Sequence, residues 1–275
     1  MTTWFITGIS RGLGLSLAKA ALAEGDTVVG TVRGPAPTLQ ESAGTLHLLT
    51  VDLADGAAAE ASVEAAFAAV GTIDVIVNNA GYGLLGAAET ATPEEVERLY
   101  AVDVFAPFRI IKAALPHLRR QGHGHILNIT SVAGRAPTLG SAFYSSAKAA
   151  LEGFSAALAA EVAPLGIKVT AVAPGAFRTD FLSDHSIRKS SAADAAYAET
   201  IGRSTAAFDA AAGRQAGDPD RAAEAILALV KAENPPIHLL LGSDALRRTR
   251  VKLDQVQDEM AAWEETTLST DFPDL

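Results

Sequence analysis

The chain has 275 residues, 49% hydrophobic and 20% charged, which is enough to bury a large core in one α/β domain. Its formal net charge of −10 argues against nucleic acid or an anionic membrane as partners, and the absence of cysteine excludes disulfides, thiolate metal ligands and a cysteine nucleophile. No run approaches the roughly 18 apolar residues of a membrane span, and the first predicted strand follows Met1 without a basic leader, so we expect a cytoplasmic protein.

The N-terminal segment has the pattern of an anion-binding turn. Trp4-Phe5-Ile6-Thr7 predicts a buried strand, Gly8 to Gly14 form a G-x-x-x-G-x-G turn, and residues 15–24 predict a helix. Backbone N–H groups and the helix dipole make such a turn a phosphate site. The usual G-x-G-x-x-G fingerprint is not met, because Leu17 occupies the position of the third glycine, and an ordinary tight turn remains the alternative.

The rest of the chain alternates between short β-branched runs and longer helical stretches. Strands are predicted at 27–32, 46–51, 73–78, 124–129, 167–173 and 237–241, and helices at 56–70, 93–120, 142–163, 218–231 and 244–267. This order predicts an α/β doubly wound parallel sheet (Rossmann-like) with helices on both faces, as a single domain over residues 1–275. Ligands of such sheets bind beyond the carboxyl ends of the strands.

Tyr144 and Lys148 are the most informative pair in the chain. They are four residues apart on a predicted helix, so both side chains lie on one face, and the ammonium is expected to lower the pKa of the phenol. A tyrosine with a lowered pKa can act as an acid or base near neutral pH. Ser131, thirteen residues upstream, is a candidate donor to a developing oxyanion, although a serine at a strand end can also simply cap a turn.

Together these motifs resemble the short-chain dehydrogenase/reductase family, from about residue 2 to Thr179. The resemblance implies catalytic roles for Ser131, Tyr144 and Lys148, with Lys148 also binding the nicotinamide ribose. It implies that the cofactor is bound by Gly8, Ser10, Arg11, Gly12, Leu13, Gly14, Arg33, Asp52, Leu53, Asn79, Ala80, Gly81, Tyr144, Lys148, Pro174, Gly175, Phe177 and Thr179. Residues 1–175 would form the cofactor-binding and catalytic core, 176–215 a substrate lid, and 244–275 a C-terminal helical extension.

One position departs from the family pattern. The asparagine that links the catalytic lysine to solvent through a water is replaced by Asp103. The carboxylate has nearly the same shape, so a catalytic relay could persist, while its charge would partly offset the effect of Lys148 on Tyr144. A purely structural hydrogen-bonding role for Asp103 is the alternative.

The end of the second strand indicates the cofactor. NAD sites place a carboxylate there, whereas this segment reads Val32-Arg33-Gly34, and Arg11 lies inside the glycine turn. Two arginines would clamp a 2′-phosphate, so NADP(H) is expected and NAD(H) is less favoured, with solvated surface arginines as the alternative.

The resemblance also suggests a substrate and an assembly. The aromatic and aliphatic residues of the lid predict an apolar ketone or alcohol, and they are Phe177, Phe181, Leu182, Ile187, Tyr197 and Phe208, with His185 beside them. The long helix bearing Tyr144 is apolar around much of its circumference, which predicts a homodimer or homotetramer. No metal site is expected, because His123 and His125 lie on a turn without an evident third ligand.

These patterns predict an NADP(H)-dependent oxidoreductase that interconverts a secondary alcohol and a ketone or aldehyde, with Tyr144 as general acid/base. A non-catalytic NADP(H)-sensing protein on the same fold is the main alternative, although such proteins usually lack the tyrosine or the lysine. A haloalcohol dehalogenase is disfavoured by Lys148 and the intact glycine turn, and an extended dehydratase or epimerase by the short segment after Thr179.

Overall fold

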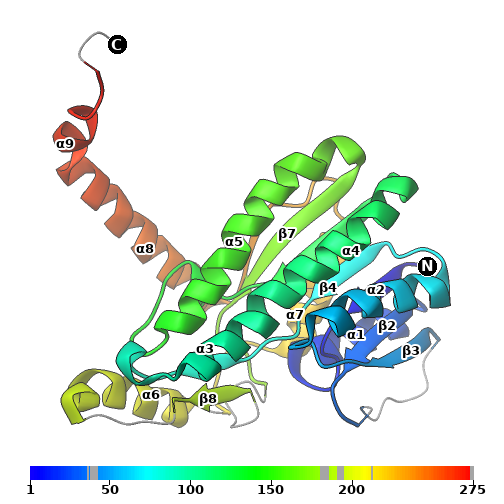
Figure 1. Ribbon diagram of the computed structural model, residues 1–275, viewed down its shortest axis with the longest axis horizontal. Helices are drawn as coiled ribbons and strands as arrows, with labels where there is room; N and C mark the ends of the chain where they lie inside the picture. Colours follow the sequence, from blue (N-terminus) through cyan, green and yellow to red (C-terminus); the bar gives the residue numbers. More distant parts are fainter. Residues whose placement is uncertain (36, 38–42, 180–185, 191–194, 212, 273–275) are drawn as a thin grey trace.

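A seven-stranded sheet forms the centre of the computed structural model, which describes residues 1–35, 37, 43–179, 186–190, 195–211 and 213–272 (Figure 1). Every strand pair in this sheet is parallel, in the order β3-β2-β1-β4-β6-β7-β9. The strands are β1 (Thr3–Ile6), β2 (Thr27–Val32), β3 (Thr45–Thr50), β4 (Val75–Asn78), β6 (Gly124–Ile129), β7 (Ile167–Pro174) and β9 (His238–Leu241). The fold expected from the sequence, a doubly wound parallel sheet, is confirmed.

Helices cover both faces of the sheet, which is why its central strands are apolar along their whole length. On one face, α1 (Gly12–Ala23) packs beside α7 (Pro219–Lys231) over a core that includes Trp4, Ile6 and Leu17. On the other face, α2 (Gly56–Val70), α4 (Ala106–Gln121) and α5 (Ala142–Val162) enclose a second core that includes Phe5. Alternate residues of β1 therefore point into different cores, as the two-residue period of a strand requires.

The order of strands changes direction between β1 and β4. Phe5 pairs with Val29 of β2 on one side and with Ile76 of β4 on the other. The chain runs outward through β2 and β3 and then returns across the sheet to β4. Such a reversal opens a crevice at the carboxyl ends of the strands, where ligands of these folds bind.

The predicted helix over residues 93–120 is interrupted in the structure. It begins as α3 (Pro93–Tyr100), where Thr92 and Glu95 form a capping box, then widens into a π-helical turn at Ala101–Phe105 and continues as α4. Single π turns in long helices are frequent at functional sites, because they rotate one side chain out of the regular helical series. Asp103 lies in this turn.

The C-terminal helix also differs from the continuous stretch expected over 244–267. The structure has α8 (Ser243–Ala262) and a short α9 (Glu264–Leu268), separated at Trp263. Figure 1 shows α8 leaving the body of the protein and pointing outward, with the C-terminus near its far end. A second, two-stranded sheet pairs β5 (Gly83–Leu85) with β8 (Ile187–Lys189), and α6 (Arg203–Ala211) lies beside it. Among the described helices, none is long and apolar enough to cross a membrane.

Candidate active site

A cavity of about 440 Å³ opens beyond the carboxyl ends of the central strands. It brings together the glycine turn, the ends of β2, β4, β6 and β7, and the first turns of α5, although these segments are far apart in the sequence. Of the residues expected to be catalytic or to bind a cofactor, all except Gly14 and Asp103 line this cavity. Those two lie behind its wall.

The glycine turn is held by the segment that follows β4. Thr7 Oγ1 accepts hydrogen bonds from the backbone N–H groups of Asn79 (2.9 Å) and Ala80 (3.0 Å). The Asn79 side chain donates in return to the carbonyl oxygens of Thr7 (2.9 Å) and Gly8 (3.1 Å). These bonds tie polar groups at the start of the turn to the segment that follows β4, so the turn stays open for a ligand.

Two glycines of the turn have conformations that other residues rarely adopt. Gly8 has φ 72° and Gly12 has φ 58°, both in the left-handed region. At Gly14 the reason for glycine is close packing: a Cβ there would lie 2.3 Å from the Asn79 side-chain nitrogen. Gly14 therefore shapes the turn from behind, whereas Gly8 and Gly12 face the cavity.

Ser131, Tyr144 and Lys148 meet at one side of the cavity. Ser131 caps the short turn after β6, where its Oγ accepts from Ala133 N at 3.1 Å, and it forms a hydrogen bond with Tyr144. Lys148 Nζ lies 5.8 Å from the centre of the Tyr144 ring and donates to the Ile129 carbonyl oxygen at 3.2 Å. Gly134 permits this meeting, because a Cβ there would lie 2.8 Å from the Lys148 backbone carbonyl carbon.

The pKa of Tyr144 differs in direction from the sequence-based expectation. Burial of the phenol disfavours the phenolate and raises the pKa of Tyr144 above its usual value. Lys148 and the hydrogen bond with Ser131 lower this pKa, and the charge of Asp103 raises it. The expectation of a lowered Tyr144 pKa was therefore wrong for the protein without ligand. The four-residue spacing indicates the nearby Lys148 ammonium, but it does not reveal the burial that desolvates the phenol.

Asp103 is fully buried and forms an ion pair with Lys148. Its Oδ2 lies 3.0 Å from Lys148 Nζ, and its Oδ1 accepts from the backbone N–H of Tyr82 at 3.1 Å. Burial raises the pKa of the Asp103 carboxyl, and the attraction of Lys148 opposes that rise. Burial alone would lower the pKa of Lys148, but the charges of Asp103 and Tyr144 more than compensate and raise it, so the lysine holds its proton.

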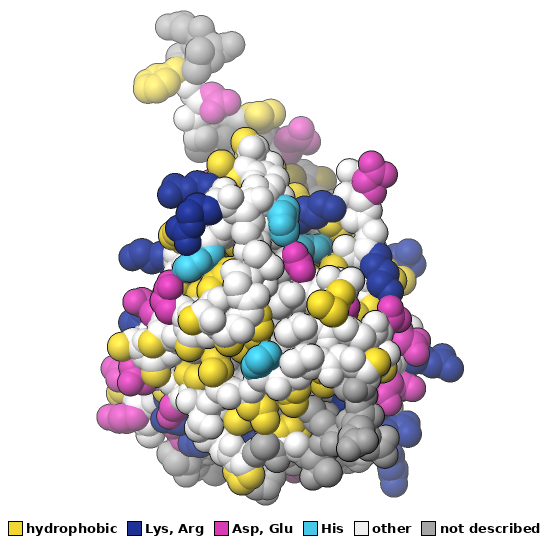
Figure 2. Space-filling model, turned by 90° about the vertical axis from the view of Figure 1, so that its right-hand side faces the viewer, with side chains coloured by type: hydrophobic (Ala, Val, Ile, Leu, Met, Phe, Trp, Pro, Cys, Tyr) yellow, Lys and Arg dark blue, Asp and Glu magenta, His cyan; other side chains and the backbone are white. Residues whose placement is uncertain are grey.

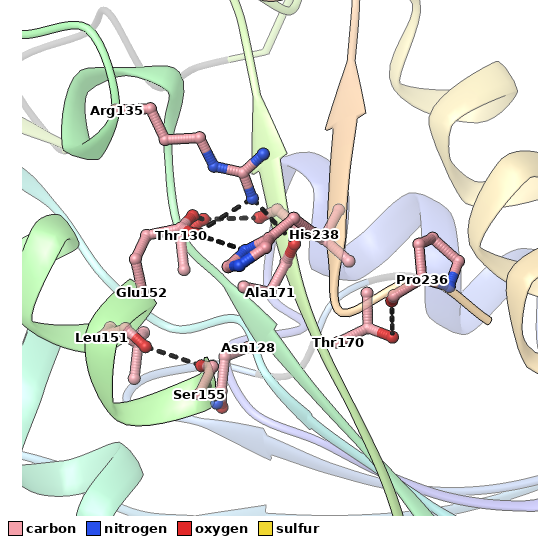
Figure 3. A network of polar contacts seen from close by, with 11 residues as sticks. Asn128, Thr130, Arg135, Leu151, Glu152, Ser155, Thr170, Ala171, Pro236 and His238 are labelled. Atoms are coloured by element: carbon pink, nitrogen blue, oxygen red, sulfur yellow. Dashed lines mark hydrogen bonds and ion pairs between the residues drawn. The ribbon is translucent and has the colours of Figure 1, made fainter. Parts of the chain in front are cut away.

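A second buried carboxylate, that of Glu152, holds together segments that flank the site. Glu152 lies one turn after Lys148 on α5 and accepts a hydrogen bond from Thr130, the residue before Ser131. It also contacts Arg135 Nη2 at 3.0 Å and His238 Nδ1 at 3.2 Å (Figure 3). Since these partners are the residue after β6, a residue of the turn that follows it and a residue of β9, Glu152 fixes the position of the Ser131 turn relative to α5.

Both cations expected to contact a 2′-phosphate line the cavity. Arg11 and Arg33 both line the cavity, and the side chain of neither forms a hydrogen bond or ion pair in the part of the chain that the structure describes. Asp52 lies nearby, accepts from Ala54 N at 3.1 Å and faces Arg98 at 3.9 Å. Two guanidinium groups are therefore available for an anion.

The residues expected in the lid are only partly at the cavity. Phe177, Ile187 and Phe208 line it, whereas the Tyr197 hydroxyl donates to Glu89 at 2.6 Å. Phe181, Leu182 and His185 lie outside the described residues. His125 is buried against Thr170 and His123 faces Asp74, and the described residues contain no group of three or more His, Cys, Asp or Glu suited to a metal.

Gln215 is a residue of the cavity wall that the sequence did not indicate. Gln215 is 4% exposed, and neither its amide nitrogen nor its amide oxygen has a hydrogen-bond partner among the described residues. Its backbone is held in place, because Arg178 donates to the Gln215 carbonyl oxygen through Nη2 (3.1 Å) and Nε (3.3 Å). Leaving a buried amide unpaired is costly, so the Gln215 amide is available to pair with a water or with a molecule bound in the cavity.

Tyr82 is another wall residue without a sequence signal. Its hydroxyl is buried and has no partner within the described part of the chain, burial raises its pKa to about 12, and Arg188 lies 5.7 Å from its ring centre. Only the tertiary structure brings Tyr82 and Arg188 to one wall, through the pairing of β5 with β8.

Comparison with known proteins agrees with this geometry. Residues 2–189 match the short chain dehydrogenase family model, and the chain belongs to that family of NAD(P)-dependent oxidoreductases. It is 34% identical over 271 residues to "Oxidoreductase BOA17" of Botryotinia fuckeliana, covering 97% of this chain and 98% of that protein. It is 36% identical over 237 residues to a 3-ketodihydrosphingosine reductase of Bacteroides thetaiotaomicron, covering 86% of each.

Solved structures show the same relationship. A short-chain dehydrogenase from Streptomyces avermitilis is 37% identical and superimposes with a TM-score of 0.88 over 98% of this chain and 100% of that one. A short-chain dehydrogenase from Sphingobium yanoikuyae, 25% identical with a TM-score of 0.71 over 95% of each chain, is in complex with NADPH. A 3-ketoacyl-(acyl-carrier-protein) reductase from Brucella melitensis, 26% identical with a TM-score of 0.70 over 87% of this chain and 96% of that one, is in complex with NADH.

Proposed function

We propose that this protein is an NADP(H)-dependent reductase and dehydrogenase that interconverts a ketone (or aldehyde) and an alcohol, with Tyr144 as the acid and base. The observation that carries the proposal is the meeting of Ser131, Tyr144 and Lys148 on one wall of the cavity that also contains the glycine turn.

The cavity suits a dinucleotide. Its glycine turn presents backbone N–H groups at the start of α1. A Cβ at Gly8 would lie 3.0 Å from Ala80, so this position requires a residue without a side chain. The nucleotide would be held by the glycine turn, by Asp52 and Leu53, by Asn79 to Gly81, by Tyr144 and Lys148, and by the segment from Pro174 to Thr179. When bound, it supplies or accepts the hydride.

The side chains would then handle the proton. In reduction, the Tyr144 hydroxyl donates its proton to the carbonyl oxygen of the substrate, while Ser131 Oγ donates a hydrogen bond to the same oxygen. In oxidation, the Tyr144 phenolate accepts the alcohol proton. Lys148 stabilises the phenolate formed in reduction, and Asp103 keeps Lys148 protonated and in place.

The preference for NADP(H) rests on Arg11 and Arg33. Both are cationic, both line the cavity, and neither is engaged elsewhere in the described chain, so a 2′-phosphate would gain two charge-assisted contacts. Replacing Arg33 by Asp and Arg11 by Ala should shift the kcat/KM ratio from NADPH toward NADH. An unchanged ratio would contradict the assignment.

The substrate should be apolar with one polar group away from the reacting carbonyl. Phe177, Ile187 and Phe208 supply an apolar wall, and the buried Gln215 amide offers one donor and one acceptor. The Bacteroides relative is named as a reductase of a ketone, which agrees with a substrate of this class.

A screen of ketones and alcohols that follows NADPH absorbance tests the proposal. The enzyme should reduce apolar ketones, and Tyr144→Phe should bind NADPH normally but turn over no substrate. A protein that binds NADPH and converts no compound in the panel would instead support the alternative of a cofactor-sensing module.

A further inference from the structure

The outward-pointing helix α8 carries an apolar stripe with the spacing of a coiled coil. Leu246, Leu253 and Met260 recur every seven residues, and Val256 and Trp263 follow the latter two by three. This is the a and d pattern of a heptad repeat, with Thr249 at the remaining d position. From Leu246 to Met260 the stripe runs for about 21 Å along the helix, at 1.5 Å per residue, and Trp263 is the residue at which the helix ends.

The stripe is open to solvent along most of its length. Leu246, Leu253, Met260 and Trp263 are between 42% and 67% exposed. The first two turns of the helix are anchored to the body: Ala245 and the Thr249 hydroxyl are buried, and Arg248 donates to the Ala136 carbonyl oxygen at 2.6 Å. In Figure 2 the outer part of α8 rises above the body, and hydrophobic and acidic side chains lie together on it.

The charges of the same helix are divided between its two halves. Between Leu246 and Leu253 there are four cations and no carboxylate, namely Arg247, Arg248, Arg250 and Lys252. From residue 254 to 268 there are five carboxylates and no lysine or arginine, namely Asp254, Asp258, Glu259, Glu264 and Glu265. A second copy in parallel would place cations against cations, whereas an antiparallel copy places each basic half against an acidic half.

The apolar stripe is self-complementary in the same antiparallel register. With the two-fold axis between residues 254 and 255, every a position meets a d position of the other helix. Leu246 meets the partner's Trp263 and Leu253 meets the partner's Val256, whereas Thr249, whose hydroxyl is buried in its own chain, lies level with the partner's Met260. Each contact occurs twice, as a two-fold interface requires. In this register Lys252 and the partner's Glu259 both occupy g positions, which face each other in an antiparallel pair.

We propose that α8 is an oligomerisation arm that pairs with the α8 of a second copy of this chain as an antiparallel coiled coil. Two independent patterns, the heptad stripe and the divided charge, agree. They indicate that a second copy of this chain covers the exposed face of α8, because one such helix supplies both complementary halves. This contact is separate from the pairing of the long helices α4 and α5 that the family resemblance suggests.

Charge reversal at the facing positions tests the register. Lys252→Glu and Glu259→Lys should each raise the dissociation constant of one association step at least threefold, as measured by sedimentation velocity at low salt. The double variant should return this constant to the wild-type value. Arg247→Glu and Asp258→Lys change the net charge in the same way at positions that face away from the seam, so they should have little effect. A double variant as weak as the single ones, or no effect of any variant, would overturn the proposal.

Disulfide trapping tests the orientation, because the chain has no cysteine of its own. A mixture of Leu246→Cys and Trp263→Cys proteins should form a cross-linked heterodimer under mild oxidation, since those positions share a layer. Leu246→Cys alone should stay uncross-linked, because its two copies lie at opposite ends of the seam. Cross-linking of Leu246→Cys alone would indicate a parallel pair, and no cross-linking in the mixture would show that the arms do not meet; either result overturns the proposal.

Discussion

Replacing Asp103 by asparagine isolates the charge of the buried carboxylate. Asp103 Oδ2 lies 3.0 Å from Lys148 Nζ, which lies 5.8 Å from the Tyr144 ring centre, so the carboxylate is within roughly 9 Å of the ring. At an effective dielectric constant of about 20, a unit charge at that distance is worth about 2 kcal/mol, or somewhat more than one pH unit. Because the negative charge raises the pKa of Tyr144, its removal should lower that pKa by about one unit.

The pH profile of alcohol oxidation measures this change. Oxidation requires the phenolate, so the acidic limb of kcat/KM with NADP⁺ should move about one pH unit lower in Asp103→Asn, whereas the Kd for NADPH should be unchanged. Asp55→Asn, an isosteric change at the N-cap of α2, is the matched control and should leave the profile in place. A shift smaller than about 0.3 pH unit, or a shift to higher pH, would refute an electrostatic role for Asp103.

Three further results are expected. Tyr144→Phe should lower kcat by at least about 10²-fold while NADPH fluorescence titrations remain normal, and retained turnover would assign the proton transfer to another group. Gln215→Leu should raise KM about tenfold for substrates with a distal polar group and leave KM for purely apolar ones unchanged, and equal effects on both would argue against the contact. His125 is buried with its pKa lowered to about 4, so the unfolded state binds its proton more readily, and stability should fall by about 2 kcal/mol between pH 7 and pH 5. Urea unfolding of His125→Leu should show a smaller fall, and an equal fall would place the effect on other groups.

The interrupted helix shows where prediction from sequence stopped. The apolar periodicity of residues 93–120 and the capping signal at Thr92 and Pro93 correctly indicated where the helix begins. The π turn at 101–105 left no mark on that periodicity, because one extra residue in a turn changes the direction of a side chain without changing the type of residue. The resemblance placed Asp103 near Lys148, but their direct ion pair and the full burial of Asp103 were visible only in three dimensions.

The residues proposed to be catalytic show the same division. Their identity followed from local spacing, since Tyr144 and Lys148 share one face of a helix wherever that helix is placed. The direction of the Tyr144 pKa did not follow, because it depends on burial in a cavity whose wall includes segments distant in sequence, such as the glycine turn and the segment near Pro174. Desolvation is a property of the assembled site.

By itself the sequence determined the alternation of strands and helices, the anion-binding turn and the pair Tyr144 and Lys148, because each is set by the order and spacing of neighbouring residues. The tertiary structure decided which charges are buried together, as with Asp103 and Lys148, and which polar groups are left unpaired, as with Gln215. It also decided that α8 points away from the body and keeps its apolar stripe exposed. The physical reason is that electrostatic and solvation energies depend on distances through space, which residue order alone does not specify.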